Sequence, residues 1–361
     1  MKVTFPHLGN LYIVLAAFFE NLGIDVVIPP PVTKKTIELG SMYSPEFACF
    51  PLKINVGNFI EALEKGADTI VMAGGVGPCR FGYYSQVQKE ILEDLGYKFD
   101  MIIFEPPRGN MKTIIYEINK LFKGKNIKKI VKSAKIAWLK ACAIEKIESQ
   151  ALYYRAREKN KGTTTRIYKS ALNLISESSN EETINANVEK INKYFKSIEL
   201  DMNYSPLKIG LVGEIYTLLE PSSNMNIENI LGDLGVEVIK SIKLTEWANT
   251  NIILDMLRIR RPDNCTFAAK PYLNYFVGGH GVESVGETVI YAQKGLDGVI
   301  HLAPFTCMPE IIAQSILYKV SKDKQIPVMT VMLDEHSAET GFRTRVEAFV
   351  DLLNQKKEAI S

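Results

Sequence analysis

The first 28 residues, MKVTFPHLGN LYIVLAAFFE NLGIDVVI (1–28), alternate two strand-like runs with one helix-like run. Lys2–Phe5 and Ile24–Ile28 are rich in β-branched and aromatic residues, whereas residues 11–22 place apolar side chains at helical spacing. A strand, a helix and a second strand in this order predict a crossover connection between parallel strands. This opening therefore predicts an α/β lobe with a doubly wound parallel sheet.

The same alternation continues along the first part of the chain. Helices are expected near Val56–Lys65 and after Tyr84, and strands at Thr69–Ala73 and Phe99–Phe104. We place the end of this N-terminal lobe near Pro107, so that it covers residues 1–110.

A second α/β pattern begins at Leu207, and its β-α-β opening from Pro206 resembles the opening at Met1. In each opening the first helix is followed by a leucine, a glycine and a hydrophobic residue, at Leu22–Ile24 and at Leu234–Val236. The similarity points to two related lobes, the second covering residues 205–361. Its expected strands and helices are Lys208–Val212, Ile227–Leu234, Val236–Ile239, Gly298–Leu302, Val328–Leu333 and the final helix Arg343–Asn354.

Between the lobes, residues 111–204 read as a helical region without strands. Apolar residues recur at helical spacing, and Ser176–Glu182 is polar enough for an exposed turn; the first apolar set is Ile114, Ile115, Ile118, Leu121 and Phe122. The fold class we predict is α/β, with two doubly wound parallel-sheet lobes, Rossmann-like or flavodoxin-like, and a helical insertion.

Composition and charge narrow the classes of function. Hydrophobic residues make up 46% of the 361 residues and charged residues 23%, which excludes a disordered chain. The net charge of +2 conceals sixteen Lys or Arg against four Asp or Glu between Lys112 and Lys169. Such a stretch suits nucleic acid or an acidic protein, but amphipathic helices with solvated lysine faces explain it more simply, so we expect no nucleic-acid partner.

Localisation is read from the apolar segments and the cysteines. The apolar run Leu11–Phe19 is followed by Glu20 and Asn21 without a small-residue cleavage site, and no window is long enough to cross a bilayer. Five cysteines, an odd number, favour reduced thiols over a disulfide framework. We therefore expect a cytoplasmic protein with no membrane partner, whose thiols are free to bind metal.

Three of the five cysteines lie in loops that suit metal binding. Cys79 follows the strand Thr69–Ala73, Cys307 follows the strand Gly298–Leu302, and Cys49 comes just ahead of a helix. Function in open α/β sheets collects in loops at the carboxyl ends of strands. Each cysteine has a proline within two residues, which stiffens the loop.

Pro309 suits the first turn of a helix, which would leave Cys307 at the helix N-terminus. The helix dipole and free amides there favour the thiolate, which is the form that binds metal. Cys142, in contrast, shares a helical run with Trp138 and Leu139 and is interpreted as a packed core thiol. Cys265 is interpreted as lying in a loop and is left unassigned.

A set of short motifs spans both lobes. These are CFPLK (49–53), GPCRFG (77–82), GEIYT (213–217) with Asn224, PFTCMPE (304–310), DEH (334–336) and TRVEAF (344–349). Together they resemble the 2-hydroxyacyl-CoA dehydratase superfamily, which includes benzoyl-CoA reductase subunits and double-cubane cluster proteins. The chain is most similar to the branch of acyl-CoA dehydratase activase-related proteins.

The resemblance implies that Cys49, Cys79 and Cys307 ligate one [4Fe-4S] cluster at the interface of the two lobes. Three thiolates would leave one iron open for a small ligand or a substrate oxygen. In the dehydratases the chemistry is one-electron reduction of a CoA thioester to a ketyl radical, after which hydroxide leaves, and an ATP-dependent activator protein supplies the electron. The implied role is low-potential electron transfer or radical reduction and dehydration in an anaerobic cytoplasm, with an oxygen-sensitive cluster.

The chain has no Walker-type glycine-lysine loop, so it would receive electrons rather than drive them. A double-cubane cluster needs six cysteine ligands, so a bridged cluster would require a second copy in a homodimer, a related subunit, or the two spare cysteines. The alternatives are half of a double-cubane reductase, a zinc-thiolate protein acting as a hydrolase or a structural site, and a binding module without a cluster.

Residues around the cysteines are further candidates. Lys53 and Arg80 are positioned in sequence to stabilise an anionic cluster, the alternative being surface ion pairs. Glu214, Glu310 and Glu335 fall in predicted loops and are candidate acid-base groups. His7, His280 and His336 also fall in predicted loops and are candidates for the same roles; structural polar roles are the alternative for each residue. The run Gly74–Gly77 lacks the last glycine of a dinucleotide loop and is interpreted as a turn that exposes Cys79.

Overall fold

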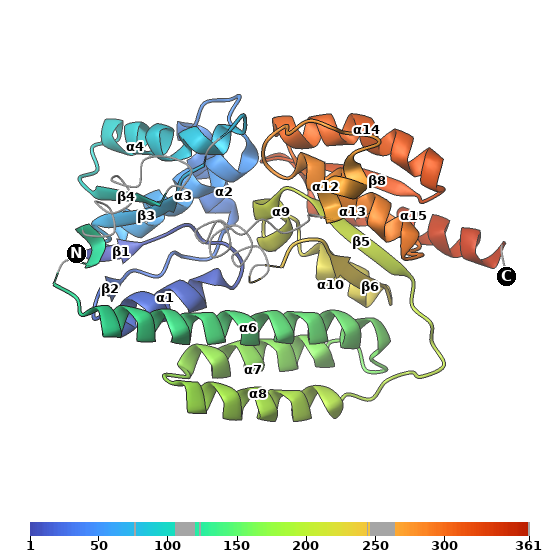
Figure 1. The fold of residues 1–361 in the computed structure, drawn as a ribbon, viewed down its shortest axis with the longest axis horizontal. Helices are drawn as coiled ribbons and strands as arrows, with labels where there is room; N and C mark the ends of the chain where they lie inside the picture. Colours follow the sequence, from blue (N-terminus) through green and yellow to red (C-terminus); the bar gives the residue numbers. More distant parts are fainter. Residues whose placement is uncertain (76, 105–119, 123, 244, 246–263, 360–361) are drawn as a thin grey trace. The chain divides into compact units, whose positions relative to one another are not determined.

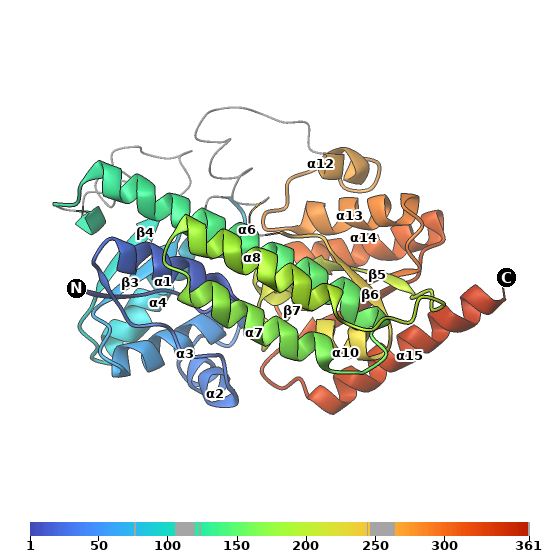
Figure 2. The same cartoon turned by 90° about the horizontal axis from the view of Figure 1, so that it is seen from below.

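The computed structural model describes residues 1–75, 77–104, 120–122, 124–243, 245 and 264–359. These residues form two units. The first contains the described part of Met1–Ala141 together with Thr245, and the second contains the described parts of Cys142–Leu244 and Pro262–Ser361. Figures 1 and 2 label most of the elements of both units.

The first unit is built on a four-stranded sheet with strand order β2-β1-β3-β4, in which every pair is parallel. Parallel strands require crossovers, and the helices between them supply these. The elements in chain order are β1 (Lys2–Thr4), α1 (Leu11–Asn21), β2 (Asp25–Val26), α2 (Lys34–Tyr43), α3 (Phe50–Glu64), β3 (Thr69–Ala73), the 3₁₀ helix η1 (Arg80–Tyr83), α4 (Tyr84–Asp94) and β4 (Asp100–Phe104).

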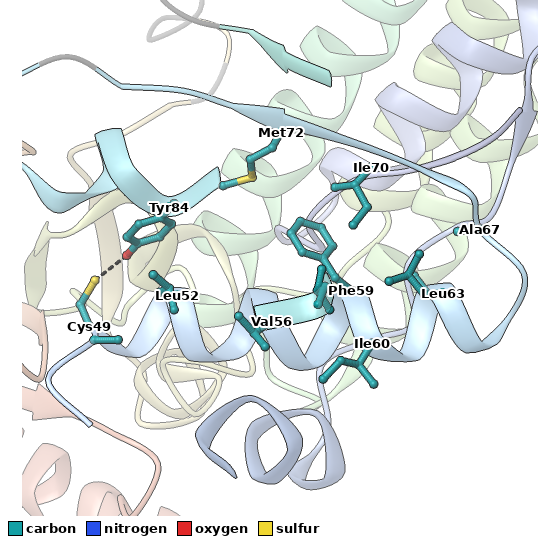
Figure 3. Close-up of a cluster of buried hydrophobic side chains, with 13 residues drawn as sticks. Cys49, Leu52, Val56, Phe59, Ile60, Leu63, Ala67, Ile70, Met72 and Tyr84 are labelled. Atoms are coloured by element: carbon teal, nitrogen blue, oxygen red, sulfur yellow. Dashed lines mark hydrogen bonds between the residues drawn. The ribbon is translucent and has the colours of Figure 1, made fainter. Parts of the chain in front are cut away.

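Helices cover both faces of this sheet. On one face, α1 packs against apolar residues of β1 and β4, including Val3 and Ile102. On the other face, α3 and α4 pack against β3 through Ile70 and Met72, and Figure 3 shows Phe59 and Leu63 of α3 directed toward this strand. Adjacent residues of a strand point to opposite faces, so a sheet with two apolar faces is buried between helices.

Helices α2 and α3 cross at two glycines. A β-carbon added at Gly57 would overlap the backbone carbonyl of Thr36, and one added at Gly40 would overlap the carbonyl of Lys53. The hydroxyl of Thr36 also donates to Glu61 of α3 at 2.6 Å. The two helices can approach this closely only because residues 40 and 57 are glycines. The crossing fixes the part of α3 that follows its first residue.

The helical region contains α6 (Ile127–Arg157), α7 (Thr163–Glu177) and α8 (Glu181–Lys196). The boundary between the two units falls within α6. Its C-terminal part joins α8 through a hydrogen bond from Gln150 to Asn192 at 3.1 Å, and α7 and α8 lie side by side in Figures 1 and 2. Asn180 and Thr183 form a capping box at the start of α8, which explains why the helix restarts there.

The second unit repeats the topology of the first, with strand order β6-β5-β7-β8 and only parallel pairs. Helices α13 and α14 cover one face, and α15 lies against the other, where Leu353 contacts the position of Gly298. The elements are β5 (Lys208–Gly213), α9 (Ile215–Leu219), α10 (Ile227–Asp233), β6 (Glu237–Lys240), α12 (Asn264–Ala269), α13 (Gly281–Gln293), β7 (Gly298–Pro304), α14 (Met308–Lys324), β8 (Val328–Leu333) and α15 (Glu339–Glu358).

The predicted fold class is confirmed, since both lobes carry parallel sheets with helices on both faces. The predicted helix near Val56 begins six residues earlier, at Phe50, because Pro51 fits a first helical turn. The predicted boundary at residues 110 and 111, and the apolar residues Ile114, Ile115 and Ile118, lie outside the described residues. The division into three regions therefore stays a prediction.

Two interpretations of cysteines are wrong. Cys142 is exposed rather than packed, because α6 buries the face that carries Ala143, Ile144 and Ile147. Cys265 lies in the first turn of α12 rather than in a loop, and it is buried against α13, where its thiol donates to the carbonyl of Glu283 at 3.3 Å.

Candidate functional site

Cys49 and Cys307 occupy the same position in two different helices. Each is the residue immediately before the first helical residue, Cys49 at α3 and Cys307 at α14, with extended backbone angles. Each helix carries a proline in its first turn, where the missing amide costs no hydrogen bond. The two thiols are 8% and 7% exposed, and neither is in a disulfide.

Cys79 repeats this arrangement at the 3₁₀ helix η1. It precedes Arg80 with φ −69° and ψ 133°, at the end of the loop that follows β3, and it is half-buried. The backbone of this loop packs closely against η1: a β-carbon added at Gly75 would lie only 2.7 Å from the ring of Phe81. This close packing explains why residue 75 is a glycine, and a dinucleotide-binding site is not needed to explain it.

The first unit brings the segments of Cys49 and Cys79 together. The Cys49 thiol is hydrogen-bonded to the hydroxyl of Tyr84, and Figure 3 shows this hydroxyl directed at the sulfur. Arg80, next to Cys79, donates from Nη1 to the carbonyl of Phe47 at 2.7 Å. These contacts join Cys49 and Phe47, which precede α3, to the segment formed by η1 and the start of α4. Lys53, one turn into α3, is also buried, at 3% exposed.

In the second unit, the predicted acid-base residue Glu214 caps a helix. It follows β5, and its carboxylate accepts hydrogen bonds at 3.0 Å from the amides of Tyr216 and Thr217 and from the Thr217 hydroxyl. Burial raises the pKa of Glu214, these hydrogen bonds act against the rise, and the charge of Glu310 adds to it. Glu214 therefore has a structural role as a helix cap, and its acid-base role stays a prediction.

Glu310 lies in the first turn of α14 and not in a loop, so its predicted setting is wrong. It is fully buried, with Oε2 2.8 Å from Nε2 of His301 and 2.7 Å from the hydroxyl of Ser284, which donates to it. Sequence reasoning missed both partners. The available signal was a histidine within the otherwise apolar strand Gly298–Pro304, since a buried polar side chain needs a partner.

His280 lies at the N-terminus of α13, close to the start of α14. A β-carbon on the next residue, Gly281, would be 2.6 Å from the carbonyl of Pro309. Burial lowers the pKa of His280, and the charge of Glu310 acts in the opposite direction. Four candidate groups of the second unit therefore lie on neighbouring segments near the carboxyl ends of β5 and β7. They are Glu214, His280, Cys307 and Glu310.

The remaining candidates lie in loops, as predicted. His7 is buried after β1, where its backbone amide donates to Asn58 at 3.0 Å. Glu335 and His336 belong to a turn closed by Asp334, whose carboxylate accepts from the amide of His336 at 3.0 Å.

The predicted ligand set is divided between the units, with Cys49 and Cys79 in the first and Cys307 in the second. Among the described residues, no three His, Cys, Asp or Glu side chains are grouped as ligands of one metal ion. The three-cysteine site therefore stays a prediction.

One family comparison covers most of the chain. The profile of the family described as "CoA enzyme activase uncharacterised domain (DUF2229)" matches residues 7–242. The chain belongs to this family. No curated protein is similar enough to count as a match.

Membership of the CoA enzyme activase family agrees with the resemblance to the activase-related branch, while the wider superfamily stays a prediction. The matched residues include Cys49, Cys79 and Glu214, and they end before Cys307 and Glu310. Within the described part of this family member, no helix combines the length and apolar character needed to cross a membrane.

Proposed function

We propose that the chain holds one [4Fe-4S] cluster through Cys49, Cys79 and Cys307 and uses it for low-potential electron transfer in the metabolism of CoA esters. The observation that carries this proposal is the common position of the three thiols, each immediately before a helix and each with extended backbone. Extended backbone is usual for a residue that precedes a helix, but a cysteine at this position in three separate loops is a shared feature of the motifs. It is useful for presenting sulfur atoms.

The chemistry of the donors fits an iron–sulfur cluster. The first amides of a helix lack intrahelical partners, and the helix dipole is positive there, so a cysteine at this position favours its thiolate form. Thiolates are soft ligands that suit iron–sulfur clusters, and nearby N–H groups tune the reduction potential. With three protein ligands, the bound cluster would supply one-electron chemistry and one iron open to a small ligand.

The proposed partner is an ATP-dependent activator or reductase protein that delivers electrons to the chain. The family description, which names CoA enzyme activase, supports a role in such a system. A homodimer or a related subunit would provide further cysteines if the cluster is a double cubane. The reaction served is a reduction or dehydration of a CoA thioester.

Iron and sulfide analysis after oxygen-free purification tests the proposal. We expect the wild-type protein to be brown and to lose most of its iron when Cys49, Cys79 or Cys307 is replaced by Ala. Cys142→Ala is the matched control, because this thiol is exposed on α6 and lies outside the motifs. Equal iron in all four variants would contradict the assignment, and zinc without sulfide would establish the zinc-thiolate alternative.

Arg80 is expected to raise the reduction potential of the cluster. Its guanidinium is held beside the Cys79 turn by the Phe47 carbonyl, and a positive charge stabilises the more negative, reduced cluster. Arg80→Gln should therefore lower the midpoint potential measured by redox titration, whereas Arg80→Lys should stay near the wild-type value. Arg166→Gln, a change on helix α7, is the control. Equal potentials in all these proteins would exclude an electrostatic role for Arg80.

A further inference from the structure

A chain of polar side chains crosses the second unit from the edge of its sheet to its interior. On the edge strand β8, the hydroxyl of Thr330 is 3.2 Å from Nδ1 of His301 on β7. The other ring nitrogen, Nε2, is 2.8 Å from Oε2 of Glu310 on α14. Thr330 is half-buried, while His301 and Glu310 are 0% exposed, so the chain leads from a partly accessible group to fully buried ones.

The carboxylate of Glu310 is bonded unevenly. Its Oε2 takes both hydrogen bonds, from Ser284 and at His301, while the buried Oε1 has no hydrogen-bond partner among the described residues. A buried carboxyl oxygen without a partner costs free energy, so a carboxyl group with a purely structural role would be expected to use both oxygens. An oxygen without a hydrogen-bond partner is available to give or to take a proton.

The open oxygen belongs to a residue near two other titratable groups. Glu310 interacts electrostatically with Glu214, which follows β5, and with His280, which precedes α13. These groups come from the carboxyl ends of neighbouring strands and from the start of a helix, where ligands of open α/β sheets bind.

We propose that Thr330, His301 and Glu310 form a proton relay between the edge strand β8 and the carboxyl ends of β5 and β7. When protonated Glu310 gives up a proton from Oε1, its Oε2 takes the proton of His301 Nε2, and Nδ1 takes the hydroxyl proton of Thr330. The hydroxyl oxygen recovers a proton from water or a buffer acid. One proton leaves the inner end, one enters from solvent, and no electron moves.

The relay is suited to this set of side chains. Imidazole can accept a proton at one nitrogen and release one at the other, and a hydroxyl can donate and accept at once. Ser284, which donates to Oε2, positions the carboxylate rather than carrying the proton. The relay goes beyond the proposed cluster, because all its members lie in the second unit and act whether or not iron is bound.

Proton exchange at the His301 ring tests the relay in the full-length chain without metal. With ring-¹⁵N histidine, the His301 signals are assigned by their loss in His301→Gln, and their exchange with water is measured by NMR. Thr330→Val should slow this exchange about fivefold, the factor that corresponds to one net hydrogen bond, whereas Thr330→Ser should keep the wild-type rate. If Thr330→Val does not fold, Thr330→Ala provides the same comparison.

Thr288→Val is the matched control, because it removes another buried hydroxyl, one that donates to the carbonyl of Ser284 at 2.7 Å and is outside the relay. Its exchange rate should equal that of the wild type. An unchanged rate in Thr330→Val, or equal slowing in Thr288→Val, would show that exchange occurs by local opening and would overturn the relay. Because no cluster is present, this outcome is independent of the iron analysis.

Discussion

Glu310→Ala is expected to destabilise the second unit by about 2–6 kcal/mol, since each buried polar group that loses its hydrogen-bond partner costs about 1–3 kcal/mol. The substitution removes the acceptor shared by His301 and Ser284, both of which are buried, and leaves two polar groups without their partner. The free energy of unfolding in urea, followed by circular dichroism, measures this loss.

A double-mutant cycle separates the interaction energy between His301 and Glu310 from the effect of changing the packing around them. His301→Leu combined with Glu310→Met should cost less than the two single changes added together, because each single change leaves the other polar group buried without its partner and the double change does not. Glu347→Ala is the control, since it removes the exposed partner of Arg343 and should leave the stability nearly unchanged. Additive single changes would show that His301 and Glu310 are not coupled.

Gly57→Ala is expected to destabilise the first unit by about 1–3 kcal/mol, the range found for overpacked cores. The added methyl group would overlap the Thr36 carbonyl, and backbone atoms of α2 cannot move away without shifting the whole helix. Because α3 carries Cys49 at its start, the same change should also lower iron binding if the proposed cluster is present.

Gly341→Ala is the matched control for this prediction. Gly341 also lies in a helix, α15, but no atom would come within 4 Å of its added β-carbon. Alanine favours helix more than glycine does, by up to about 1 kcal/mol, so this variant should be stabilised. Thermal unfolding of the two variants should therefore shift in opposite directions, and shifts of the same sign would refute the steric explanation.

The local features of the site were readable in the sequence because they depend on neighbouring residues. A proline two positions after Cys49 and Cys307 predicts a first helical turn, and both cysteines precede one. The positions of Cys79 and Glu214 after strands follow from the same local patterns. The roles of these residues at a cluster remain predictions.

Other features could not be derived in this way, because they depend on which segments meet. Cys142 has the spacing of a core residue, but the buried face of α6 is the one that carries Ala143 and Ile147. Tyr84 contacts Cys49 from a helix 35 residues later, and the partners of Glu310 come from β7 and α13.

The sequence by itself determined the two parallel α/β lobes, because alternating strand and helix periods are properties of short segments that repeat along the chain. Only the tertiary structure decided which polar groups are buried together, since the network of Ser284, His301, Glu310 and Thr330 joins four elements of the second unit. Burial and hydrogen bonding at such distances are consequences of packing, and no local pattern specifies them.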